Sequence, residues 1–130
     1  MAFARTLLSS GASSRVGFVA TGMGATSLYG DWAKSNNNLY KRMIVATNNA
    51  MASAIAQWGP LSVKLRGMLW VQGESDGFSG AVDVGNSHLN YGVNFQKFVG
   101  DVRADLVQYN AQLPVIMVGG GEGWRVGRGG

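Results

Sequence analysis

The amino-acid sequence predicts an α/β protein built around a parallel β-sheet, and three observations carry that prediction. Helix-like and strand-like segments alternate along the chain, three of each, beginning with a helix. The strand-like segments are apolar throughout, as in strands that helices cover on both faces. The length of 130 residues is that of a single domain. We therefore expect a three-layer α/β/α arrangement with the sheet in the middle.

Three helices follow from apolar spacing and from residues that end helices. Phe3 and the two leucines after it lie on one face of a short helix, which Gly11 should end. Between residues 39 and 58, apolar side chains recur at helical spacing, and the Gly-Pro pair at 59–60 ends that segment. Residues 91–106 repeat the amphipathic pattern and predict a third helix.

Three short apolar segments, 16–20, 63–71 and 115–118, are predicted to be the strands. Ligands bind at the carboxyl ends of the strands in parallel α/β sheets. The loops that leave the first two strands, 21–27 and 72–90, are therefore where a functional site is expected. We expect the two loops to meet at one edge of the sheet, with the Gln72 side chain facing the backbone of Gly24 and Ala25.

The composition argues against several classes of protein and site. Lys and Arg number 11 and Asp and Glu 7, for a net charge of +4, but the basic residues are scattered, which argues against nucleic-acid binding. The chain has no cysteine and one histidine, so we expect no disulfide, no metal site and no cofactor. No apolar run approaches the ~18 residues of a membrane-spanning helix.

The two ends of the chain differ from the middle. Seven of the last twelve residues are glycine, so residues 119–130 are expected to form a mobile tail after a domain of residues 1–118. Trp124 and a terminal Arg-Gly-Gly leave open a contact between this tail and RNA bases. The acid-free first 30 residues fit a targeting segment as well as a helix, and the sequence assigns neither a compartment nor an oligomeric state.

The residues with the most distinctive chemistry follow the second predicted strand. Residues 70–76 read Trp-Val-Gln-Gly-Glu-Ser-Asp, which places an amide and two carboxylates within five residues of a strand end. A side-chain amide aimed at an oxyanion is worth ~2.7–4 kcal/mol in acyl transfer. The alternative interpretation is a polar loop in which Gln72 and Glu74 only hold the backbone of a turn. Spacing alone favours this alternative.

The heptapeptide resembles the signature of the sialate O-acetylesterase-like carbohydrate esterases, which belong to the SGNH/GDSL hydrolase superfamily. Further segments are similar to blocks of that family in the same order: Phe3-Ala4-Arg5, Gly24-Ala25-Thr26-Ser27-Leu28 with Trp32, Leu39-Tyr40 with Met43, Tyr91 with Asn94-Phe95, Val102-Arg103 with Asp105-Leu106, and Leu113-Pro114-Val115-Ile116. The resemblance runs from Phe3 to Val118 and implies a flavodoxin-like α/β/α fold with a parallel sheet.

The resemblance also implies an activity, namely hydrolysis of acetyl esters on sugars by a serine nucleophile, with an acetylated carbohydrate as the partner. Gln72 matches the amide of the family's oxyanion hole, and Gly24 matches the first of two glycines that contribute an N–H. Glu74 matches an acid of the signature loop. These three are the candidate catalytic residues, and the candidate substrate-binding residues are Ala25, Thr26, Ser75 and Asp76. Ala25 stands where the family has its second glycine.

Two catalytic blocks of that family do not occur in the 130 residues, neither the Gly-Gln-Ser block of the nucleophile nor the Asp-x-x-His block of the base. His88 lies five residues after Asp83 and in the wrong block, so we expect it to be solvated rather than a base. Ser27 and Ser75 have no histidine partner by motif. The sequence therefore predicts a fragment of an acetylesterase that is inactive alone; the alternative is a pseudo-esterase that binds a glycan or a partner without catalysis.

Overall fold

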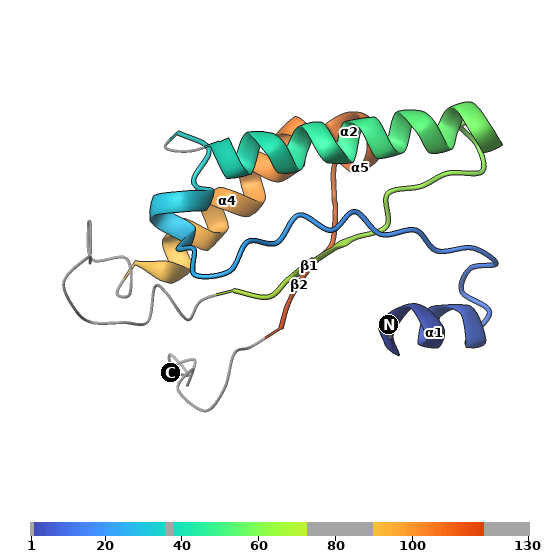
Figure 1. Cartoon of the computed structure of the whole chain (residues 1–130), viewed down its shortest axis with the longest axis horizontal. Helices are drawn as coiled ribbons and strands as arrows, with labels where there is room; N and C mark the ends of the chain where they lie inside the picture. The colour runs from blue at the N-terminus through green and yellow to red at the C-terminus, as the bar shows by residue number, and fades with distance from the viewer. Residues whose placement is uncertain (1, 36–37, 73–89, 119–130) are drawn as a thin grey trace.

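The computed structural model describes residues 2–35, 38–72 and 90–118 (Figure 1). The described elements are helices and two short strands: α1 (Ala2–Ser9), η1 (Leu28–Trp32, one turn of π-helix), α2 (Asn38–Trp58), β1 (Met68–Trp70), α4 (Tyr91–Asp105), α5 (Val107–Asn110) and β2 (Val115–Met117). This combination of helices with a small parallel sheet is compatible with the predicted α/β class.

The three predicted helices are present, with bounds close to those predicted. Gly11 follows α1 with φ of +76°, and Gly59 follows α2 with φ of +82°. Both values lie in the left-handed region where glycine ends helices without steric cost. α4 begins at Tyr91, as predicted, and the short helix α5 follows it after Leu106. Within the described ranges, no helix is long and apolar enough to cross a membrane.

The sheet consists of β1 and β2, which pair in parallel with Met68 opposite Val115 and Trp70 opposite Met117. The prediction of parallel strands at these two places is therefore confirmed. β1 is three residues long, however, although the apolar run predicted a strand from 63 to 71. Ladder hydrogen bonds exist only where the partner strand extends, from the Pro114 carbonyl to the Val118 N–H, and that sets the length of β1.

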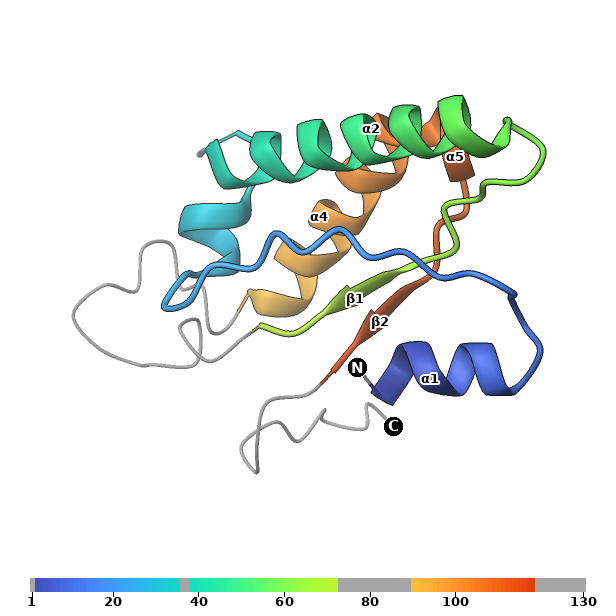
Figure 2. The same cartoon turned by 45° about the vertical axis from the view of Figure 1, so that its right-hand side comes forward.

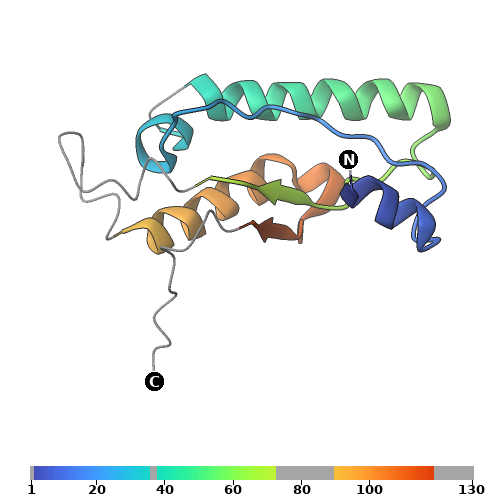
Figure 3. The same cartoon turned by 60° about the horizontal axis from the view of Figure 1, so that its bottom comes forward.

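The predicted strand at residues 16–20 is wrong as a paired strand, because no ladder forms there. Its backbone makes no hydrogen bond with any described residue. All three views place β1 between this segment and β2 (Figures 1, 2 and 3). A β-strand requires a neighbour for its N–H and C=O groups, and the apolar composition of the segment does not provide one.

The core lies on one face of the sheet, between the strands and the helices α2 and α4. Trp70 is 5% exposed at its centre, with its ring 4.5 Å from that of Phe98 and 5.5 Å from that of Trp32. On the other face, Leu69 and Ile116 are 37% and 51% exposed. The expectation that helices cover both faces is therefore not met by the described residues: α1 buries none of its side chains and contacts the 16–20 segment through an edge-on pair of Phe3 and Phe18.

Candidate active site

The two loops that were expected to meet do so at the carboxyl end of β1. The Gln72 side chain leaves the end of β1 and its Nε2 donates a hydrogen bond of 2.8 Å to the carbonyl oxygen of Thr26. The predicted convergence is confirmed at Gln72, although the first loop follows an extended segment and not a paired strand. The contacted atom belongs to Thr26, one residue beyond the Gly24 and Ala25 backbone that was predicted.

The turn at Gly24 and Ala25 presents its backbone at the surface. Ala25 has φ of +57°, the left-handed region that favours glycine, and is the one non-glycine residue with positive φ among those described. A Cβ atom added at Gly24 would meet nothing within 4 Å. Within the described part of the chain, no acceptor bonds the N–H of either residue. The turn therefore offers two backbone donors next to the Gln72 contact.

Thr26 holds this turn to the core through its side chain. Its hydroxyl donates to the carbonyl oxygen of Met23 at 2.7 Å and accepts from the indole Nε1–H of Trp32 at 2.9 Å. Trp32 is 3% exposed and packs edge-on against Trp70. The hydroxyl of Thr26 thus connects the exposed turn to a buried tryptophan, while its carbonyl oxygen receives Gln72.

Ser27 begins η1 and its hydroxyl serves that helix. The Ser27 Oγ accepts from the Gly30 N–H at 3.0 Å, and the Asp31 carboxylate accepts from the Ser27 N–H at 2.8 Å. This is a reciprocal cap like a capping box, with the acid one residue further along. A Cβ at Gly30 would lie 2.8 Å from the Ser27 Oγ, so glycine fits closely here. No sequence pattern had predicted η1.

Gln72 is also held from its other side, by the buried residues Trp70 and Tyr91. The Tyr91 hydroxyl donates toward two oxygens of Gln72, the side-chain Oε1 at 3.0 Å and the backbone carbonyl at 3.1 Å. The same hydroxyl accepts from the indole Nε1–H of Trp70 at 3.1 Å. Trp70 is the first residue of the heptapeptide and Tyr91 begins one of the blocks that resemble the family, but neither was among the predicted site residues. The signal that could have identified them is chemical, since a buried Trp or Tyr nearly always needs a partner for its polar atom.

The described residues thus contain part of the predicted site. Gly24, Ala25, Thr26 and Gln72 lie together at the carboxyl end of β1. Glu74, Ser75 and Asp76, like His88 and residues 119–130, lie outside the described residues. Among the residues that the structure describes, no group of three or more His, Asp or Glu side chains could hold a metal ion.

A charged cluster connects the segment after η1 to α2 and α4. The Asp105 carboxylate accepts from Lys34 Nζ at 2.9 Å and from the Tyr40 hydroxyl at 2.7 Å. The hydrogen bonds from Lys34 and then Tyr40 lower the pKa of Asp105. Burial, followed by the bond to Asp105, raises the pKa of Tyr40 above its ordinary value of 10.0. The cluster is a structural link in which Asp105 bonds Tyr40 and Lys34, which lie 65 and 71 residues before it in sequence.

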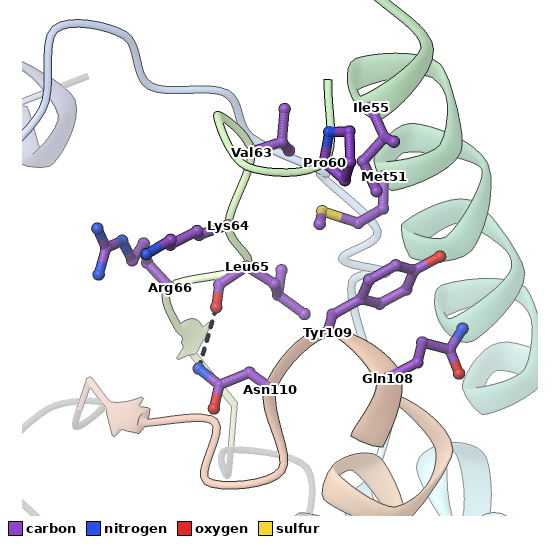
Figure 4. Close-up of a pocket in the computed structure, with 10 residues that line it drawn as sticks. All are labelled: Met51, Ile55, Pro60, Val63, Lys64, Leu65, Arg66, Gln108, Tyr109 and Asn110. Carbon is purple, nitrogen blue, oxygen red and sulfur yellow. Dashed lines mark hydrogen bonds between the residues drawn. The ribbon is translucent and has the colours of Figure 1, made fainter. Parts of the chain in front are cut away.

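A separate hollow lies at the amino end of β1, at the opposite end of the strand from Gln72 (Figure 4). It has a volume of about 420 Å³ and apolar walls that include Met51, Ile55 and Tyr109. The side chains of Lys64 and Arg66 point away from these walls (Figure 4). Neither basic side chain therefore points into the hollow. The hollow is also distinct from the candidate site, because it lies at the other end of β1.

Comparison with known proteins connects this arrangement to one family. No curated protein and no solved structure gives a significant match to the chain. The family model for carbohydrate esterases described as sialic acid-specific acetylesterases matches residues 1–125, which is almost the whole sequence. That match covers both loops of the candidate site. The chain therefore belongs to the carbohydrate esterase family of sialic acid-specific acetylesterases.

Proposed function

We propose that the chain is the central part of a serine O-acetylesterase that removes acetyl groups from sugars, and that it carries the oxyanion-stabilising half of the catalytic site. The observation that carries this proposal is the hydrogen bond from Gln72 to Thr26, which supports placing a side-chain amide beside the exposed Gly24–Ala25 turn. Family membership supports an acetylated carbohydrate as the substrate.

In this proposal, the tetrahedral intermediate forms when a serine oxygen attacks the carbonyl carbon of the acetyl group. The carbonyl oxygen then carries a negative charge, which N–H donors must stabilise. An amide NH₂ group has two hydrogens, and in this proposal Gln72 donates one to Thr26 and the other to the oxyanion. The Gly24 N–H is the second proposed donor. The catalytic base takes the serine proton during this attack and returns it to the sugar oxygen that leaves when the intermediate collapses, so the sugar departs with a free hydroxyl and the serine keeps the acetyl group. A water molecule, deprotonated by the same base, then attacks the acetyl-serine and releases acetate.

The other candidate residues have proposed roles in the same site. Glu74 is proposed to hold the signature loop or to assist the base, and Ser75 and Asp76 to contact the sugar. Ala25 and Thr26 are proposed to border the acetyl group. A resident cofactor is not required, because acyl transfer of this type uses only a nucleophile, a base and N–H donors.

The nucleophile and the base are proposed to come from sequence outside these 130 residues. The Gly-Gln-Ser and Asp-x-x-His blocks do not occur in the chain. Met68 and Trp70 use their backbone groups to bond β2, so the N–H and C=O of Leu69 face the extended segment 16–20. A strand inserted there would pair with both and complete a flavodoxin-like three-layer domain, to which residues 119–130 would form a tail.

The test compares the 130-residue chain with a longer chain that carries both missing blocks, on an acetylated chromogenic ester and on O-acetylated sialic acid. We expect turnover by the longer chain and background hydrolysis by the short one, because a serine without an adjacent base is a weak nucleophile. In the longer chain, Gln72→Ala should reduce kcat by ~10²–10³. Gln112→Ala, at an exposed position after α5, is the matched control and should leave kcat unchanged.

Two outcomes would contradict the proposal. Robust turnover by the short chain that Ser27→Ala or His88→Ala abolishes would mean that the chain holds a different, complete active site. Binding of an acetylated sugar by the longer chain without any turnover would indicate the pseudo-esterase instead.

A further inference from the structure

The Tyr91 hydroxyl occupies the junction between the core and the candidate site. Tyr91 is the first residue of α4 and is 3% exposed. Its hydroxyl lies 3.1 Å from the Trp70 Nε1 and 3.0 Å from the Gln72 Oε1. On the far side of the same amide, Nε2 lies 2.8 Å from the Thr26 carbonyl oxygen. Four residues thus form one continuous series of hydrogen bonds.

We propose that Tyr91 is a positioning residue that determines which way round the Gln72 amide faces. The proposal concerns the same site as the proposed function, and its catalytic consequence rests on that function. The orientation of the Gln72 amide does not depend on that function, because it can be measured without substrate. Trp70 contributes through Tyr91, by supplying the donor that occupies the hydroxyl oxygen.

The direction of hydrogen bonding along the series is determined at both ends. An indole N–H can only donate, and a backbone carbonyl oxygen can only accept. The Tyr91 hydroxyl therefore accepts from Trp70 and directs its single hydrogen toward the oxygens of Gln72. The Gln72 Oε1 is left facing Tyr91, and the NH₂ group faces Thr26 and the exposed turn.

The opposite orientation of the amide is disfavoured at both of its contacts. Rotation by half a turn would put Oε1 at the 2.8 Å position opposite the Thr26 carbonyl oxygen, with no hydrogen between the two oxygens. It would also remove Oε1 as an acceptor of the Tyr91 hydrogen, so that the hydroxyl would keep only the backbone carbonyl oxygen of Gln72, at 3.1 Å, as its acceptor. Loss of a hydrogen bond to a buried polar group is costly, so the two ends together select one orientation.

The hydroxyl is held in place by the aromatic core. The Tyr91 ring stacks on Phe95 with centroids 6.2 Å apart and an angle of 8° between the planes. Trp70 is in turn packed against Phe98 at 4.5 Å. Trp70 and Tyr91 therefore project from packed elements, β1 and α4, and the Tyr91 hydroxyl reaches a side chain at the start of a loop.

The test is nuclear magnetic resonance on the 15N-labelled 130-residue chain, read at the Gln72 side-chain NH₂ group. In Tyr91→Phe we expect both NH₂ resonances to move toward those of the exposed Gln112 and their exchange with water to become about tenfold faster, equivalent to one hydrogen bond. The matched control is Tyr40→Phe, which also removes a buried, hydrogen-bonded hydroxyl packed near Phe98 but leaves the Gln72 contacts intact. In that control the Gln72 signals should stay where they are.

Unchanged Gln72 signals in a folded Tyr91→Phe chain would overturn the positioning role. If that variant does not fold, the unsubstituted chain decides: the Trp70 indole N–H and one Gln72 Nε2 hydrogen must exchange at least about tenfold more slowly than the side-chain amide of Gln112, and equal rates would overturn the proposal. In the longer, active chain, Tyr91→Phe should lower kcat with little change in KM. Shifted Gln72 signals with an unchanged kcat would contradict the oxyanion role of Gln72 but not the positioning role of Tyr91.

Discussion

The side-chain amide of Gln72 donates a 2.8 Å hydrogen bond to the carbonyl oxygen of Thr26, although 46 residues separate the two in sequence. The bond joins the loop after β1 to the turn that precedes η1. Because Thr26 is also fixed to Trp32, and Gln72 to Tyr91, each side of the bond is anchored in the aromatic core. The contact between Gln72 and the turn is therefore held from both sides by buried residues.

Thr26→Val should destabilise the chain by about 1–3 kcal/mol, because it leaves the indole N–H of the buried Trp32 without an acceptor. Valine has nearly the same shape as threonine, so lost packing contributes little. Chemical denaturation monitored by tryptophan fluorescence measures the change. Trp32→Phe in the Thr26→Val background should cost less than in the unsubstituted chain, since the N–H is already unpaired there.

Thr6→Val is the matched control for that experiment. The Thr6 hydroxyl bonds only the preceding turn of α1 at an exposed position. Its replacement should change the unfolding free energy by no more than about 0.5 kcal/mol. Thr26 would not be anchored through Trp32 if Thr26→Val lowered the unfolding free energy as little as Thr6→Val does. The same would follow if Trp32→Phe cost as much in the Thr26→Val chain as in the unsubstituted chain.

Ala25→Gly should stabilise the chain by about 0.5–1 kcal/mol. At φ of +57° an alanine is strained by its Cβ, which costs about 1–2 kcal/mol in the left-handed region. The greater freedom of glycine in the unfolded state offsets about 0.4–1 kcal/mol of that gain. The substitution also produces the glycine pair that the resembled family has at this turn. Thermal unfolding of the two chains is the measurement.

The control for Ala25→Gly is Ala111→Gly, at an exposed residue with φ of −64°. Alanine is unstrained there, so glycine only adds freedom to the unfolded state and should destabilise the chain. Opposite signs at the two positions are the expected result. A loss of stability at both would mean that the turn does not hold Ala25 in the left-handed region in solution.

The helices could be predicted from sequence because their signals are local. The apolar spacing of α2 and the left-handed glycine at its end, Gly59, are properties of the segment itself. Strands depend on neighbours, and here the local pattern failed. Residues 16–20 are apolar enough for a buried strand but have no described backbone partner, and β1 is limited to the three residues that β2 reaches.

The candidate site was predictable in location but not in detail. Gln72 at the end of β1 does contact the turn after Gly24, as expected from strand ends that meet at one edge, but the segment that leads into that turn is not a paired strand, so this argument from topology holds for β1 alone. The turn η1, the Ser27 cap and the hydroxyl of Tyr91 were not predicted. The η1 turn and the Ser27 cap are local but do not follow the spacing of an ordinary capping box, because the acid lies four residues after Ser27. The bond from Tyr91 joins residues that are 19 apart in sequence, and no residue pattern of this chain indicates that they meet.

Asp105→Asn should reduce the loss of stability that the chain shows on the acid side. The pKa of Asp105 in the folded state is lowered from 3.8 by hydrogen bonds from Lys34 and Tyr40. Because this pKa is lowered, Asp105 contributes its full share to the unfolding free energy above pH 3.8, and this share is lost as the pH falls through the pKa of the folded state. We therefore expect the two chains to differ most near neutral pH and to converge at the lowest pH, as measured by urea denaturation across a pH series. Curves that stay parallel throughout would show that Asp105 does not titrate differently in the folded chain.

The exposed face of the sheet should make the 130-residue chain self-associate, and Ile116→Lys should weaken this. Ile116 is 51% exposed beside Leu69, and within the described residues the backbone N–H and C=O of Leu69, on the side of β1 away from β2, make no hydrogen bond. Open strand edges with apolar side chains pair with other chains, and a lysine at such an edge opposes that pairing.

Val93→Lys adds the same charge on α4 at a residue that is 67% exposed, away from the sheet, and is the matched control. Sedimentation velocity over a range of concentrations should show a smaller associated fraction for Ile116→Lys than for Val93→Lys, with both variants keeping their unfolding free energy within about 0.5 kcal/mol. Equal association in the two variants would mean that the exposed face of the sheet is not the contact.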